Sequence, residues 1–237
     1  MLVSLRNYSN YSICESNVKI DDLVNFASKN NLSAVGLTDY KLLSGSLEFS
    51  IKCQKAGIQP IIGLDVDYKS NLDHLKRVTF LSKSEEGFKN LNTLSTEINT
   101  NNNFLLNADN IKDYAKGNIL ILGGLYSYFE DISINQKNLN KVLIEINNLK
   151  QIFKNDLFFE YDLNLNNDLL KEVSKKLEIP LFNSFFSFYK SANDFDAMQI
   201  LHCVKNGEYL QNSTFKIDNN YSLDKSEGNV DKSLVLN

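Results

Sequence analysis

The sequence predicts an α/β protein in which roughly seven strands alternate with amphipathic helices. Three observations support this prediction. Compact apolar runs, too short for helices, recur along the chain. Segments with apolar residues at helical spacing separate most of these runs, and glycine, asparagine or proline marks the junctions. This alternation favours parallel strand pairing and an α/β layer or barrel.

The first elements can be placed from the amino terminus. A short strand is expected at 3–5, and a helix with acidic residues in its first turn follows over 20–27. Ala34 to Thr38 is apolar enough for a buried strand. A second helix is expected over 47–56 and a third strand over 60–64.

The later elements continue the same alternation. The expected strands are 77–81, 119–122, 157–161 and one beginning at 179, with helices over 85–98, 141–153 and 169–177. The only two prolines, Pro60 and Pro180, stand at strand entries, where a missing N–H costs little. From Lys205 the alternation is lost, so we divide the chain into a barrel domain, 1–204, and a carboxyl-terminal extension or linker, 205–237.

Composition excludes several classes of protein. The 237 residues are 43% hydrophobic and 23% charged, which excludes a disordered or fibrous chain. No apolar run reaches the ~18 residues of a membrane span, and no signal peptide is recognisable. The three widely spaced cysteines predict cytoplasmic free thiols instead of a disulfide or zinc framework. The net charge of −4 opposes binding of the whole chain to DNA phosphates but leaves room for a local basic groove.

Chemistry in a parallel α/β fold is expected at the carboxyl ends of the strands. Glu15, Asp39 and Asp65 could meet there and bind a hard cation such as magnesium. The alternative, which we favour, is that they are loop carboxylates that accept hydrogen bonds from helix N-termini or solvent. His74 and His202 are expected to be structural, and no serine-triad or nucleotide-loop motif is present.

An aromatic cluster over 182–189 could stack nucleic-acid bases. It contains no arginine, and its only neighbouring cation is Lys190. We therefore favour core or protein-interface packing for this segment.

Several motifs, in order and spacing, are similar to those of one family. They are Ser4 to Ser12, similar to H-L-x-x-H-S-D-Y-S; 34–39, similar to A-L-A-L-T-D; 45–49 with 55–63, similar to G-x-x-E-F and K-A-G-I-K-P-I-I-G; and 81–91, similar to L-A-K-N-E-E-G-Y-K-N-L. Over nearly its whole length the chain resembles the N-terminal PHP (polymerase and histidinol phosphatase) domain of the bacterial DNA polymerase III alpha subunit. The resemblance implies a distorted seven-stranded (β/α)7 barrel, similar to a TIM barrel.

Metal-binding members of this family hold up to three divalent ions on His, Asp and Glu side chains at the barrel mouth. Most of the matching positions here carry other residues: Arg6, Tyr8, Tyr40, Arg77, Asn164, Phe186 and Phe188. Glu15 and Asp39 are retained, and Asp65 stands in place of a glutamate. We therefore expect no catalytic residue and no metal, with an arginine paired to Asp65 or Asp39 in the vacated volume. The alternative is a residual phosphoesterase or 3′–5′ exonuclease with one weakly bound divalent cation on Glu15, Asp39 and Asp65.

The resemblance also implies partners. In the family this domain precedes the palm, thumb and fingers of the polymerase, whose catalytic aspartates are absent here. The expected role is to brace the polymerase palm and thumb of the same full-length chain and to dock the proofreading exonuclease within the replisome. DNA would be contacted only through the parent polymerase, and no membrane partner is expected.

Overall fold

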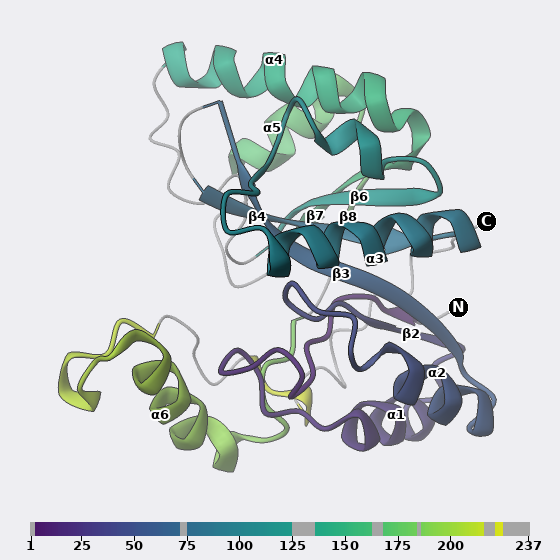
Figure 1. Ribbon diagram of the computed structural model, residues 1–237, viewed down its shortest axis with the longest axis vertical. Helices are drawn as coiled ribbons and strands as arrows, with labels where there is room; N and C mark the ends of the chain where they lie inside the picture. The colour runs from purple at the N-terminus through teal and green to yellow at the C-terminus, as the bar shows by residue number, and fades with distance from the viewer. Residues whose placement is uncertain are drawn as a thin grey trace. The chain divides into compact units, whose positions relative to one another are not determined.

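The computed structural model of the chain is drawn in Figure 1. It describes residues 3–71, 75–124, 136–162, 168–183, 186–215 and 221–224. The chain divides into two units, one made of Met1–Ile62 with Ser184–Asn237 and the other of Gly63–Asn183. The first unit is therefore discontinuous in sequence.

The first unit is built on parallel strands. Strand β1 (Val3–Ser4) pairs with β2 (Ala34–Leu37), and β2 pairs with the start of β3 (Gln59–Lys69). Helices α1 (Ile20–Lys29) and α2 (Ser46–Lys55) make the two crossovers that parallel pairing requires.

The core of this unit lies between the crossover helices and β2. Leu23 and Ala27 of α1 are fully buried with Phe49 and Cys53 of α2 and with Val35 of β2. Burial of each large side chain contributes roughly 1.5–3 kcal/mol. The apolar positions of α1 recur at helical spacing, so the sequence pattern produces this packing directly.

Gly36 is required where β1 and β2 meet. A Cβ atom at this position would lie 2.0 Å from the carbonyl oxygen of Leu5. Only glycine therefore allows the two backbones to approach this closely.

The carboxyl-terminal segment completes the first unit. It contains η3 (Ala192–Asp194), α6 (Phe195–Asn206) and η4 (Leu210–Asn212), and α6 ends at Gly207 with a left-handed φ of 66°. Parallel bridges join Asn7 to Ser187 and Tyr189 to Ser222.

The second unit contains the rest of the sheet. The later part of β3 pairs with β4 (Leu75–Ser82), and β4 pairs with β6 (Asn118–Gly123), both antiparallel. Parallel pairs then join β6 to β7 (Leu157–Tyr161) and β7 to β8 (Leu181–Asn183). The short β5 (Leu106–Asn107) runs parallel to the end of β3.

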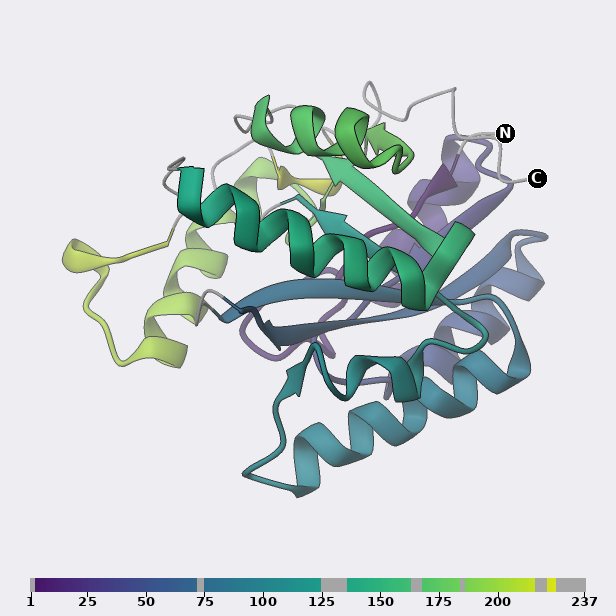
Figure 2. The ribbon, with the colours of Figure 1, turned by 90° about the horizontal axis from the view of Figure 1, so that it is seen from above.

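Helices cover these strands. Helices α4 (Gln136–Phe153) and α5 (Asp168–Leu177) both pack on β7, and α3 (Glu85–Thr100) packs along β4, as Figure 2 shows from above. Two short 3-10 helices, η1 (Ile111–Tyr114) and η2 (Lys154–Asp156), precede β6 and β7. None of the described helices combines the length and the hydropathy that crossing a membrane requires.

The α/β class and the expected strands and helices are confirmed, but two details are wrong. Strand β4 is antiparallel to β3, because the connection from Lys69 to Leu75 is too short for a crossover helix. It is also antiparallel to β6. Asp65 was expected after the third strand, yet β3 continues to Lys69 and Asp65 lies inside it. The proposed boundary at 204/205 falls within α6 and stays a prediction.

Candidate functional site

Four of the predicted site residues form one buried cluster in the first unit. Arg6 and Tyr8 follow β1, and Phe186 and Phe188 come from the carboxyl-terminal segment; each is at most 1% exposed. Arg6 Nη2 donates to Tyr8 Oη at 3.0 Å, and the Arg6 guanidinium lies 4.4 Å from the centre of the Phe186 ring. Tyr8 stacks on Phe188 at 4.8 Å. A cation–π contact shielded from water contributes about 2 kcal/mol, and the aromatic pair about 0.5–1.5 kcal/mol.

Asp39 anchors the loop that follows β1. It is 2% exposed, and its carboxylate accepts from the Ser9 N–H at 2.6 Å, from Ser9 Oγ at 2.7 Å and from Ser12 Oγ at 2.6 Å. Burial raises the pKa of Asp39 above its ordinary value, and the hydrogen bonds from Ser12 and Ser9 offset part of that rise. Both oxygens are therefore already committed to protein donors.

Glu15 and Tyr40 meet a lysine that the sequence analysis did not single out. Lys205 of α6 donates to Glu15 Oε1 and also lies 5.6 Å from the centre of the Tyr40 ring. Lys41 lies over the same ring at 4.7 Å. The Lys205 ammonium thus neutralises Glu15 and occupies the place beside this carboxylate that a metal cation would need.

Asp65 and Arg77 lie diagonally across the antiparallel β3–β4 pair of the second unit, where Thr79 is the residue directly opposite Asp65. Asp65 is fully buried and accepts from Thr79 Oγ1 at 2.7 Å, while Arg77 Nη1 lies 3.8 Å from Asp65 Oδ2. This ion pair is the one that the sequence predicts for Asp65. The Thr79 hydrogen bond and the arginine explain how a carboxylate fits inside a buried strand.

The remaining predicted residues are not part of these groups. Asn164 and His74 lie outside the described residues. His202 on α6 packs against Phe215, with ring centres 5.1 Å apart, and its Nε2 lies 2.8 Å from Asn206 Nδ2. These contacts fit the structural role expected for His202.

The residues of the first unit do not fit a cluster of divalent ions. A guanidinium carries a fixed positive charge, and a phenyl ring has no lone pair to donate. Asp39 and Glu15 are occupied by serine donors and by Lys205. Over the described ranges, no three His, Cys, Asp or Glu side chains come together in a group that could hold a metal ion.

The family of the chain follows from its sequence. A model of the PHP domain family matches residues 4–163, more than half of the chain. The chain belongs to the PHP domain family. As a PHP domain it is 30% identical over 234 residues to a protein of Borreliella burgdorferi and 29% identical over 234 residues to one of Buchnera aphidicola, both named DNA polymerase III subunit alpha. These matches cover 86% and 93% of this chain but only 19% and 20% of the relatives, so the PHP domain spans about a fifth of their length.

Solved structures share the fold of this PHP domain. An amidohydrolase from Chromobacterium violaceum is similar with a TM-score of 0.52 at 7% identity, covering 80% of this chain and 88% of the other. A Bifidobacterium adolescentis protein described as a metal-dependent phosphoesterase reaches 0.51 at 7% identity, covering 77% and 86%. At this identity the likeness shows the fold alone, and it confirms the predicted PHP-type α/β barrel class.

Two features of the site escaped the sequence analysis. Lys205 was taken only as the start of the extension, because nothing local links it to Glu15, which lies 190 positions away in the chain. Ser9 and Ser12 lie inside the opening motif, but the motif does not identify them as the donors to Asp39. In sequence, two serines in a loop do not indicate a hydrogen-bond partner. Their role becomes apparent only when the fold brings them to Asp39, the buried carboxylate that follows the next strand, β2.

Proposed function

We propose that the chain is the PHP domain of a replicative DNA polymerase III alpha chain and works as part of that longer polymerase. The support is the name shared by its relatives and the fraction of their length that it spans. The polymerase activity would then belong to the parts of the longer chain that lie outside these 237 residues.

Within that chain, the domain is a structural element whose ancestral site is degenerate and binds no metal. The observation that carries this proposal is the Arg6 guanidinium stacked on Phe186 and hydrogen-bonded to Tyr8. The family resemblance expects histidine ligands at Arg6 and Tyr8 and an aspartate ligand at Phe186. Charge at the site is supplied by arginine and lysine side chains, so an ion is not needed to neutralise the acidic residues.

Metal content tests this proposal directly. The purified chain is dialysed without chelator and analysed by inductively coupled plasma mass spectrometry, beside a histidine-retaining PHP phosphoesterase prepared in the same way. We expect well below one equivalent of zinc, manganese or iron in this chain and stoichiometric metal in the control. Two or more equivalents in this chain would overturn the metal-free reading.

Hydrolysis tests the alternative, a single cation on Glu15, Asp39 and Asp65. We expect no release of p-nitrophenol from its phosphate ester and no shortening of single-stranded DNA with added Mg²⁺ or Mn²⁺. Activity that Asp65→Ala abolishes and Asp67→Ala leaves intact would favour the residual enzyme instead.

The scaffolding role needs an exposed apolar surface. The aromatic segment 182–189 does not supply it, because Phe186, Phe188 and Tyr189 are each at most 1% exposed. These three side chains therefore pack in the core of the first unit.

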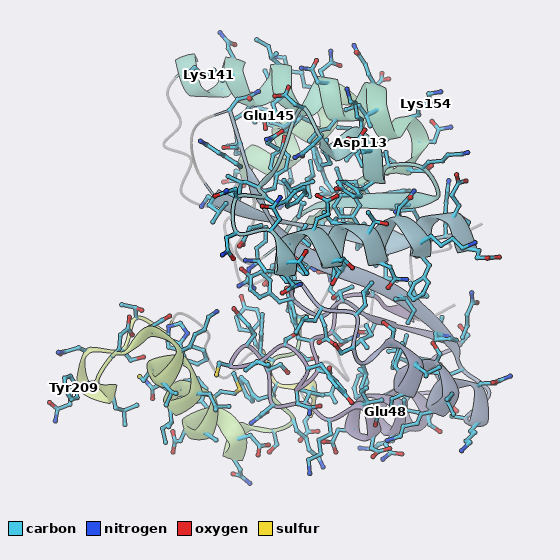
Figure 3. All side chains as sticks on the ribbon, viewed as in Figure 1. Glu48, Asp113, Lys141, Glu145, Lys154 and Tyr209 are labelled. Carbon is cyan, nitrogen blue, oxygen red and sulfur yellow. The ribbon has the colours of Figure 1, made fainter. Side chains whose placement is uncertain are left out.

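Helix α6 and the turn after it supply such a surface. Ile200 and Val204, one helical turn apart, are 51% and 70% exposed, and Tyr209 after the helix is 81% exposed (Figure 3). A contiguous exposed apolar patch is a common feature of protein-docking faces, and the pair on α6 has a third large apolar side chain, Tyr209, in the turn that follows. We assign this α6 face to the docking of a partner, the proofreading exonuclease, while the palm and thumb of the longer chain are braced elsewhere.

Co-elution on size exclusion tests the docking face. The chain mixed with its cognate exonuclease should co-elute, and Ile200→Glu with Val204→Glu should abolish this. The matched control is Leu47→Glu with Ile51→Glu, since these side chains are also exposed and one turn apart on α2. Absence of co-elution by the unmodified chain would overturn exonuclease docking, and equal loss in both variants would overturn its assignment to α6.

A further inference from the structure

A basic hollow lies in the second unit, and its lining contains none of the candidate-site residues described above. Its volume is about 690 Å³, and its lining includes four lysines, Lys83, Lys112, Lys116 and Lys154, together with Phe153. Asp156 is the only carboxylate among the lining residues. A chain with a net charge of −4 thus concentrates four lysines around one depression.

Two of the four lysines are neutralised and two are not. Lys83 pairs with Asp156, and Lys116 pairs with Glu86 at 2.8 Å. Lys112 and Lys154 are exposed and make no ion pair with any residue that the structure describes. The hollow therefore offers two exposed ammonium groups that are not neutralised by a described residue, in addition to the two paired ones.

The fold places these lysines at one end of the strands. Lys83 follows antiparallel β4, Lys116 precedes β6, and Lys154 precedes β7, so the hollow lies at the amino ends of the parallel strands. The sites of PHP-type chemistry are expected at the carboxyl ends. The two locations are separate features of the fold.

Lys154 adopts an unusual backbone conformation at the edge of the hollow. Its φ is 55°, in the left-handed region that costs a residue with a Cβ about 1 kcal/mol or more. It stands directly after α4, as Figure 3 shows. A glycine would remove this cost, but it would also remove one of the two unpaired ammonium groups.

We propose that this hollow binds the phosphodiester backbone of DNA without reading its sequence, which revises the expectation from the family resemblance that DNA is contacted only through the parent polymerase. The lining offers lysines, which act as point charges, and neither arginine forks nor exposed aromatic rings for base recognition. Spaced ammonium groups around an open depression match a run of phosphates better than one buried anion. The choice of DNA among polyanions rests on the proposed replication role. The existence of the hollow and its lysines does not depend on that role.

Fluorescence anisotropy of labelled oligothymidylate tests the proposal. The 237-residue chain is titrated into the probe at NaCl concentrations between 50 and 200 mM, and a duplex of the same length forms a second arm. Lys112→Glu with Lys154→Glu should weaken binding at least tenfold at 50 mM. In Lys112→Ala with Lys154→Ala, the slope of log K against log[NaCl] should fall by about 1.4, since each lost phosphate contact accounts for about 0.7 on a single strand.

The control carries the same change of net charge. Lys19→Glu with Lys55→Glu alters two exposed lysines of the first unit and should change the affinity less than twofold. Equal weakening in both glutamate variants would overturn the site, because only net charge would then matter. Absence of DNA binding would overturn DNA as the ligand. Displacement of DNA by polyglutamate at equal charge concentration would also overturn it and would favour an acidic protein segment. Failure here would leave the metal-content and co-elution tests unaffected.

Discussion

Replacing Arg6 with alanine should destabilise the chain by about 3–5 kcal/mol. The substitution removes the guanidinium contact with Phe186, worth about 2 kcal/mol when buried, and a charge-assisted hydrogen bond to Tyr8, worth about 1.5–3 kcal/mol. Arg6→Lys should lower the free energy of unfolding by less, because an ammonium keeps the positive charge. Some loss should remain, since an ammonium cannot stack as a planar group on the ring.

Urea denaturation followed by circular dichroism at pH 7 measures this loss. With a slope of about 3 kcal/mol per molar urea, the midpoint should fall by about 1.3 M for Arg6→Ala. Lys19→Ala, at an exposed position, should leave the midpoint unchanged, and EDTA should not alter the midpoint of the unmodified chain. A shift for Arg6→Ala below about 0.3 M, equivalent to about 1 kcal/mol, would refute the reasoning that side-chain contacts hold this site together.

Three further predictions concern single contacts. Gly87→Ala should lower stability by about 3 kcal/mol, because its Cβ would lie 1.9 Å from the Gly117 carbonyl oxygen; Gly57→Ala, with open space around it, should cost about 1 kcal/mol, and equal thermal shifts would contradict this. Tyr68→Phe should cost about 1.5–3 kcal/mol in urea titration, because the buried Glu145 (Figure 3) loses a 2.7 Å hydrogen bond, whereas Tyr209→Phe should cost nothing. Burial raises the pKa of Asp39, so its contribution to stability is complete below about pH 4 and is lost as the pH rises through the folded-state pKa. The stability of the unmodified chain relative to Asp39→Asn should therefore fall as the pH is raised above about 4, and a rise would refute the assignment.

The regular elements could be predicted from sequence because their burial is periodic. Helix α1 buries one face, and β2 is buried along its whole length, so each pattern identifies its element. Strand direction leaves no such mark. The apolar run of β4 looks the same in either orientation, and only the short connection after Lys69 determines that it runs antiparallel.

The candidate site was predictable in composition but not in its contacts. The replacement of expected ligands by Arg6 and Phe186 is visible in the sequence, whereas the stacking of one on the other depends on a closure between residues 180 positions apart. Asp65 was misplaced because a charged residue in an apolar run resembles a strand end. Its partner Thr79 becomes apparent only from the β3–β4 register.

The discontinuity of the first unit has a consequence for its biosynthesis. During translation the β1-α1-β2-α2 segment emerges first, yet the bridge from Asn7 to Ser187 and the ring beneath Arg6 come from residues made after the whole of Gly63–Asn183. The second unit, Gly63–Asn183, is continuous, so its strands can pair with one another as soon as it leaves the ribosome. Of β3, only the start, which belongs to the first unit, pairs with β2. The amino-terminal residues must therefore wait, incompletely packed, until synthesis has passed the end of β8, and a nascent chain arrested earlier would expose them to chaperones and proteases.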